Sequence, residues 1–116
     1  MHRVWHDIIS RLVLEYGHMA YRIIFSEEAQ DHLENLSVRE RQIVFARIRA
    51  SLLEAPTRET RNLKMLRPNP LARYELRAGS LRVFFDPSEV EGTVRVLAIG
   101  RKRRNRLIVG GQEVSL

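Results

Sequence analysis

The stretch Tyr74–Phe85, YELRAGSLRVFF, decides the fold that this sequence predicts. Apolar and charged residues alternate on both sides of Gly79-Ser80, a pattern typical of two half-buried strands joined by a tight turn. In the first strand, predicted over residues 71–77, Ala72, Tyr74 and Leu76 share one face and the charged residues share the other. The sequence therefore predicts an antiparallel hairpin with an apolar face and a charged face.

Strand-like sequence continues after this hairpin. Residues 94–99, VRVLAI, are the most apolar run in this half of the chain and predict a central strand. Residues 101–106, RKRRNR, carry five basic residues in six, and the apolar run 107–109 follows them. Together with the hairpin, these runs predict three or four strands in succession.

A strand and two helices are predicted before the hairpin. The run YRIIF at 21–25 is rich in β-branched and aromatic residues and predicts a strand. Ser26 is the expected N-cap of a first helix, and Ser37 with Glu40 forms a capping box that begins a second helix, running to about Glu54. The residues expected on the buried face of the second helix are Ile43, Val44, Ile48, Leu52 and Leu53.

This order of elements predicts an α+β fold. The helical hairpin would cover one face of a small twisted antiparallel sheet, and the other face would remain open. Residues 19–116 are expected to form this domain. Residues 1–18 are expected to form an additional amphipathic helix, because Trp5, Ile8 and Leu12 recur at helical spacing. Met19 offers a second start, so the sequence leaves open whether 1–18 belong to the physiological protein.

The composition excludes several kinds of protein. The chain of 116 residues has the size of one domain, and it contains no cysteine, which excludes disulfides, cysteine-ligated zinc and thiol chemistry. No apolar run approaches the roughly 20 residues that a membrane span needs, so we expect no membrane contact. The absence of cysteine suits a cytoplasmic protein, which is the expected location. The four histidines lie in the first third at spacings that form no metal site, and His32 is expected at the surface.

Positive charge is concentrated in the second half of the chain. The net charge is +6, but residues 1–56 hold seven basic and eight acidic residues, whereas residues 57–116 hold thirteen and six. A basic half of this kind favours a polyanion or an acidic protein as partner. The alternative is a charge that serves only solubility.

A cluster of charged residues is predicted on the open face of the sheet. Arg73, Glu75 and Arg77 lie two residues apart, so they share a face, and Arg82 joins them from the adjacent strand. Guanidinium groups in such a cluster fit phosphate binding and could stabilise the charge of a phosphoryl transition state. The alternative is a solvated face on which Glu75 bridges two arginines for a modest gain.

Three stretches of the sequence together resemble the RelE/ParE toxin superfamily. They are the hairpin at 74–85, VRVLAIGRKRR at 94–104 and YRIIFSEEA at 21–29, and the resemblance covers about residues 20–108 in the right order. It implies a RelE-like fold and a type II toxin. It also implies a cognate antitoxin, encoded beside the toxin, that binds and neutralises it in a hetero-oligomer.

The superfamily includes two activities. Members of the RelE branch cleave ribosome-bound mRNA with the 2′-hydroxyl as nucleophile, without a metal or other cofactor, whereas members of the ParE branch inhibit DNA gyrase and cleave no nucleic acid. We expect the first activity, a ribosome-dependent mRNA endoribonuclease that inhibits translation. The alternatives are a gyrase inhibitor and an inactive relative that acts as an antitoxin-binding module.

The resemblance also implies roles for particular residues. Arg82 falls on the hairpin arginine that contacts the scissile phosphate in RelE-type enzymes, and Arg73 and Lys102 fall on positions that are often basic. With Glu75 as a possible base, these four are the expected catalytic residues. The expected RNA- and phosphate-binding residues are Lys64, Arg77, Arg101, Arg103, Arg104 and Arg106.

Two positions depart from the family pattern. Glu75 stands where the best-known ribosome-dependent members carry lysine, and Ile108 stands where they carry tyrosine or histidine. Neighbouring arginines would hold Glu75 in its charged form, which makes a poor base. A lysine or Tyr74 remains as general acid, and Tyr74 is expected to face inward. Replacing Arg82 by alanine is expected to abolish toxicity and leave the fold intact, because Arg82 is placed on the open face.

Overall fold

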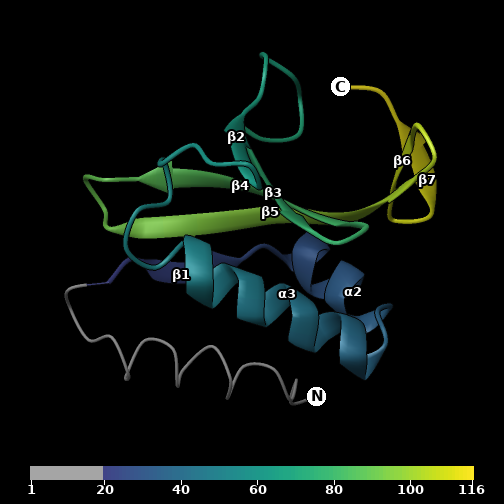
Figure 1. Cartoon of the computed structure of the whole chain (residues 1–116), viewed down its shortest axis with the longest axis horizontal. Coiled ribbons are helices and arrows are strands. Elements are labelled where there is room, and N and C mark those ends of the chain that lie inside the picture. Colours follow the sequence, from purple (N-terminus) through teal and green to yellow (C-terminus); the bar gives the residue numbers. More distant parts are fainter. Residues whose placement is uncertain (1–19) are drawn as a thin grey trace.

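The computed structural model describes residues 20–116, in which two helices form a layer against one face of a sheet (Figure 1). This arrangement confirms the predicted α+β fold with a helical hairpin on one face. The predicted helix over residues 1–18 lies outside the described residues. The elements in chain order are β1 (Arg22–Phe25), α2 (Glu27–Glu34), α3 (Val38–Ser51), β2 (Leu63–Met65), β3 (Tyr74–Ala78), β4 (Leu81–Ser88), β5 (Thr93–Arg103), β6 (Arg106–Val109) and β7 (Gln112–Val114).

Within the described residues, seven strands form one sheet. Six of them follow the chain in the order β2-β3-β4-β5-β6-β7, and every pair along this path is antiparallel, as predicted. β1 is the exception, because it pairs with β5 in parallel. β1 pairs with residues 93–96 of β5, and β6 pairs with residues 100–103, so two strands share one edge of β5.

Both helices begin at the caps that the sequence predicts. The Ser26 side chain accepts a hydrogen bond from the backbone of Ala29, and Ser37 and Glu40 form the reciprocal capping box. α3 ends at Ser51, nearly one turn before the predicted end at about Glu54. In residues 20–116 no helix is long and apolar enough to cross a membrane.

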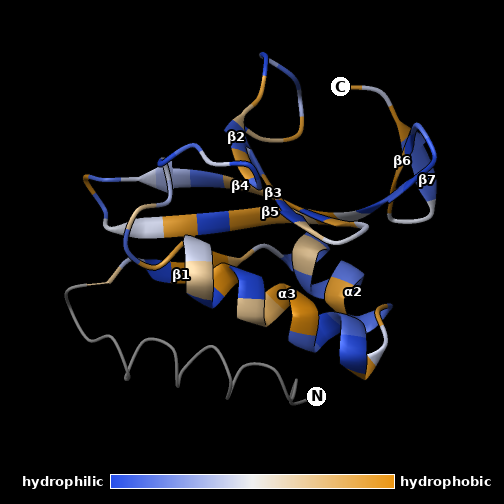
Figure 2. Ribbon diagram, viewed as in Figure 1, coloured by the Kyte–Doolittle hydropathy of each residue, from blue (hydrophilic) through white to orange (hydrophobic). Residues whose placement is uncertain are grey.

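The main core lies between the helices and the sheet. Figure 2 shows hydrophobic and hydrophilic residues alternating along α3, as expected for a helix with one buried face. Ile43 is 41% exposed, so its predicted burial is wrong, whereas Phe45 is buried and packs edge-to-face on Phe25. The largest fully buried side chains of this core are Leu33, Ile48, Leu52, Leu53, Leu63, Leu76 and Phe85.

The side chains of Ser26, the N-cap of α2, and of His32 in α2 complete the shared edge of β5 where neither β1 nor β6 pairs. The Ser26 hydroxyl donates to the carbonyl of Leu97 at 3.1 Å, and Nδ1 of His32 accepts a hydrogen bond from the backbone N–H of Ile99 at 3.1 Å. Buried backbone groups need such partners. His32 is therefore a half-buried structural residue, and the expectation that it lies at the surface is wrong.

Protonation of His32 is expected to destabilise the fold. Burial lowers the pKa of His32, and nearby Asp31 and Glu28 oppose that shift only in part. The unfolded chain therefore binds a proton at His32 more readily than the folded protein does. The stability that neutral His32 contributes is complete at neutral pH and is lost as the pH falls below the ordinary histidine range. Between pH about 7.5 and about 5.5, we expect the free energy of unfolding to fall by about 1 kcal/mol, the value of one hydrogen bond. Urea unfolding at both pH values measures this loss, and His32→Gln should remove most of it.

The face of the sheet opposite the helices is concave and partly covered. Figure 1 shows the loop between β2 and β3 and the β6–β7 hairpin standing on this side. They bring together a second apolar cluster around Phe84, with Ala72, Ala98 and Leu107. No second layer covers this face within the described residues, so the predicted open sheet is confirmed. The strands β2 and β7, which lie at the two ends of the sheet, were not predicted.

Candidate functional site

Glu75 lies in the middle of the concave face. It belongs to β3, where it pairs with Lys64 of β2 on one side and with Phe84 of β4 on the other. It is only 7% exposed, and with Thr93 it is one of the two buried polar or charged residues in the described chain. Burying a carboxylate costs free energy unless charged or hydrogen-bonding groups contact it. The residues that contact Glu75 therefore define the candidate site.

Each oxygen of Glu75 contacts a different cation. Oε1 lies 3.4 Å from Nε of Arg82, and Oε2 lies 3.6 Å from Nζ of Lys64. These two contacts supply the charged partners that a buried carboxylate needs. The side chain of Lys64 is 51% exposed, so one partner is fixed in the sheet and the other reaches it from the solvent side.

Arg82 is built into the sheet. Its side chain is 11% exposed, and Nη1 donates to the carbonyl of Gly79 at 2.7 Å and to that of Leu81 at 3.0 Å. Burial lowers the pKa of Arg82, the Glu75 carboxylate raises it, and nearby Arg77 lowers it. Arg82 therefore holds both the β3–β4 turn and Glu75. Arg82 lies on the sheet face opposite the helices, as expected, but its side chain is largely buried there.

A cleft of about 470 Å³ opens beside Glu75 on the concave face. Three cationic side chains line it, those of Lys64, Arg67 and Lys102, and Glu75 is its one acidic lining residue. The remaining lining residues are Met65, Leu66, Asn69, Asn105, Leu107, Val114, Ser115 and Leu116. A cleft with cations around one carboxylate can bind a phosphodiester and place a proton acceptor beside it.

Asn69 fixes the loop that forms one wall of this cleft. Its side-chain oxygen accepts from the backbone of Leu71 at 2.8 Å and of Ala72 at 3.1 Å, and its amide donates to the carbonyls of Arg67 and Ala72. This loop carries Arg67, a cleft residue that was not predicted from the sequence. The Pro-Asn-Pro sequence at 68–70 predicts a rigid turn in this loop.

Arg73 and Arg77 do not join the cleft. Arg73 precedes β3, and its Nη2 donates to the carbonyl of Pro87 at 2.6 Å, while Nε lies 3.9 Å from Asp86. Arg77 is exposed and stands opposite Arg82 in the sheet register. Of the four predicted catalytic residues, the structure brings Glu75 and Arg82 into contact and places Lys102 at the same cleft, whereas Arg73 lies elsewhere.

The other predicted basic residues surround the tip of the β5–β6 hairpin. Arg101 points to the helical side of the sheet, where Nη1 lies 2.6 Å from Oε2 of Glu40 and this contact lowers the pKa of Glu40 to about 2. Arg106 contacts Glu113 at 3.3 Å. A hollow of about 900 Å³ is lined by Arg101, Arg103, Arg104, Asn105, Arg106 and Ile108. This arginine surface shares only Asn105 with the lining of the Glu75 cleft. Arg101 and Arg103 face the opposite side of β5 from Lys102, because successive residues of a strand face opposite ways.

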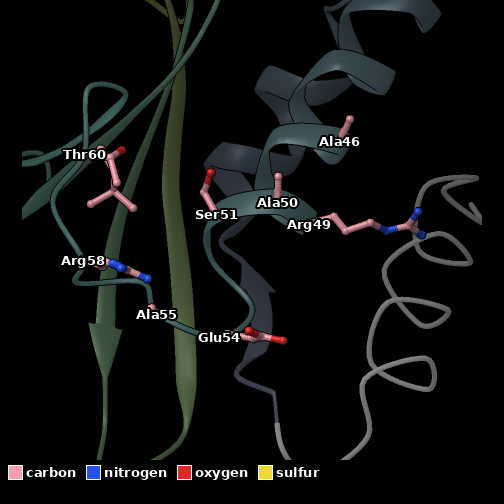
Figure 3. Close-up of a pocket in the computed structure, with 9 residues that line it drawn as sticks. Ala46, Arg49, Ala50, Ser51, Glu54, Ala55, Arg58 and Thr60 are labelled. Carbon is pink, nitrogen blue, oxygen red and sulfur yellow. The ribbon is translucent and has the colours of Figure 1, made fainter.

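A third hollow, of about 620 Å³, lies between α3 and the segment that follows it. Figure 3 shows Arg49 extending from the helix on one side and Arg58 standing on the other, so their charges do not converge. Its other lining residues include Ala46, Ala50 and Ala55. The Glu75 cleft is therefore the better candidate for chemistry.

The residues that line the Glu75 cleft in the described chain include no histidine and no tyrosine. Tyr74 faces the helical side, as predicted, and stacks on Phe85 at 5.5 Å. Ile108 lines the arginine surface, whereas its neighbour Leu107 lines the cleft. The cleft thus offers one carboxylate and three cations. Among these cations, the two lysines are the ones able to act as general acids.

No protein-family profile and no curated protein sequence matches the chain. Among solved structures, a chain in the crystal structure of the toxin–antitoxin complex RelBE2 from Mycobacterium tuberculosis is similar, with a TM-score of 0.59 and 23% sequence identity. The similar region covers 72% of this chain and 99% of that chain. The chain has a RelE-like fold. The resemblance to the RelE/ParE superfamily that the sequence indicates is thereby confirmed at the level of the fold.

The RelE-like fold does not by itself assign roles to the site residues. Among residues 20–116, no three histidine, aspartate or glutamate side chains are grouped as a metal site would require.

Proposed function

We propose that this chain is the toxin of a type II toxin–antitoxin system, and that it inhibits translation by cleaving ribosome-bound mRNA. The observation that carries the proposal is the Glu75 cleft, where a buried carboxylate faces Lys64, Arg67 and Lys102. The basic second half of the chain favours a polyanionic substrate.

The chemistry of the cleft suits a reaction at a phosphodiester. The 2′-hydroxyl of the RNA attacks the adjacent phosphorus, and Glu75 accepts its proton. Lys102 and Arg67 stabilise the additional negative charge on the phosphoryl oxygens. Because the nucleophile belongs to the RNA, the protein has to supply position, charge and proton transfer.

An antitoxin is the expected protein partner. The similar solved structure is a toxin–antitoxin complex. The arginine surface around Arg103 and Arg104 lies on the other side of the sheet from the cleft and is exposed. Acidic side chains of an antitoxin would complement it, and such complementarity mainly raises the rate and specificity of association.

Inhibition of DNA gyrase without cleavage is the second candidate function. The observation that favours it is the cleft lining, where the described residues include no histidine or tyrosine to act as general acid. In this case the charged surfaces would recognise gyrase or its complex with DNA.

Inducible expression in a bacterial host separates these functions. After growth stops, total RNA is mapped by 5′-end sequencing, with and without an inhibitor that blocks translation. New cuts in translated regions that disappear when translation is blocked would support the ribonuclease. Growth arrest with intact mRNA and a DNA-damage response would support the gyrase inhibitor, and normal growth would support an inactive antitoxin-binding module.

A further inference from the structure

Both lysines of the chain line the Glu75 cleft. The sequence contains twenty basic residues, of which eighteen are arginines and two are lysines, Lys64 and Lys102. They come from β2 and from β5, which are separated by two other strands of the sheet. Arginine supplies the positive charge at every other basic position of the chain, so a requirement for charge alone does not explain the two lysines of this cleft.

Lysine and arginine differ in what they can do with a proton. A guanidinium keeps its proton under all conditions in which proteins function, whereas an ammonium can release one and take it back. A site that needs a proton donor beside a carboxylate can therefore use lysine but not arginine. Of the two lysines, Lys64 has its ammonium 3.6 Å from Glu75.

We propose that Lys64 is the general acid of the cleavage reaction and that it works as a pair with Glu75. This inference rests on the proposed ribonuclease function. The 2′-oxygen bonds to phosphorus and gives its proton to Glu75, the bond from phosphorus to the 5′-oxygen breaks, and Lys64 gives its proton to that oxygen. The products are a 2′,3′-cyclic phosphate and a 5′-hydroxyl.

The contact between Glu75 and Lys64 restores the site after each reaction. The reaction leaves a neutral carboxyl at Glu75 and a neutral amine at Lys64. Because the two groups lie at contact distance in the free protein, the proton passes from the carboxyl to the amine and regenerates the ion pair. Arg82 contacts Glu75 from within the sheet, and the side chain of Lys64 is 51% exposed, so RNA can reach Lys64 from the solvent side.

The test uses ribosome complexes programmed with two versions of one mRNA. One version has ordinary linkages, and the other has sulfur in place of the 5′-oxygen at the cleaved linkage. A thiolate leaves without protonation, so this second substrate needs no general acid. The variants are Lys64→Arg, which keeps the charge, and Lys102→Gln, which removes a charge. Arg95→Gln, an exposed change on β5 outside the cleft lining, is the control.

Lys64→Arg is expected to lower the rate on the ordinary mRNA by about 100-fold or more, the usual contribution of general acid catalysis, and to cleave the sulfur substrate at close to the wild-type rate. Lys102→Gln should lower both rates by the same factor. Equal losses for Lys64→Arg on the two substrates, or no loss, would overturn the role of Lys64 and leave the ribonuclease intact. A wild-type protein that cleaves neither substrate would overturn both proposals.

Discussion

Replacing Arg82 by alanine is expected to lower the free energy of unfolding by about 3 kcal/mol, the cost of leaving one member of a buried ion pair alone. The carboxylate of Glu75 would keep Lys64 as its one cation, and the carbonyls of Gly79 and Leu81 would lose their donor. Urea unfolding measures this loss. Because proteins are typically stable by only about 5–15 kcal/mol, a loss of toxicity in this variant would combine lower stability with any loss of chemistry, so the variant is not the clean test of chemistry that the sequence alone implies.

Arg77→Ala is the matched control for Arg82→Ala. Arg77 is the register partner of Arg82 on the next strand, but it is exposed, and its charge disfavours that of Arg82. Its removal should change stability by less than about 0.5 kcal/mol, as is usual at exposed positions. Equal stability of Arg82→Ala and Arg77→Ala would show that the contact between Glu75 and Arg82 contributes little.

Glu75→Gln is expected to lower the rate of mRNA cleavage by a factor between about 100 and 10,000, the usual range for loss of a general base. Glutamine keeps the shape of the side chain and an oxygen that can accept a hydrogen bond from Arg82. Most molecules of the variant should therefore stay folded at about 25 °C. Cleavage of mRNA on programmed ribosomes, measured well below the melting temperature of the variant, gives the rate.

Glu89→Gln is the control for Glu75→Gln, because Glu89 is exposed and lies in the turn between β4 and β5, outside the lining of the cleft. Its rate should equal that of the wild-type protein. A folded Glu75→Gln protein that cleaves at the wild-type rate would remove Glu75 from the chemistry. The cleft would then serve for binding alone.

Features of the fold that depend on neighbours in sequence were predictable. The caps at Ser26 and Ser37 depend on residues three positions away, and the β3–β4 hairpin depends on its own alternation and turn. The apolar stripe of α3 was predictable for the same reason, except at Ile43. Local patterns therefore gave the class of fold and the order of most elements.

Features that depend on distant segments were not predictable. The parallel pairing of β1 leaves a gap at the edge of β5 that His32 fills, and no local pattern reveals this gap. Alternation placed Arg73 beside Glu75, but Arg73 precedes the strand and contacts Pro87. Glu75 is buried, and its register partner Phe84 belongs to an apolar cluster that β6, β7 and the loop before β3 complete, so this packing depends on segments far apart in the sequence.

The candidate site was predicted in part. Alternation along the predicted strand identified Glu75, and the resemblance to the RelE/ParE superfamily identified Lys64 and Lys102; the three residues do line one cleft. The sequence did not separate them from Arg101 and Arg103, which lie on the other side of the sheet. That separation requires the register of β5 and the position of the helices.

The chemical state of the RNA ends tests the central claim most directly. Purified protein is incubated with programmed ribosomes, and the two fragments at each cut are analysed for their terminal groups. Attack by the 2′-hydroxyl predicts a 2′,3′-cyclic phosphate on the upstream fragment and a 5′-hydroxyl on the downstream fragment, and a 2′-deoxy nucleotide at the cut should abolish cleavage. A 3′-hydroxyl with a 5′-phosphate, or mRNA that stays intact, would contradict the account.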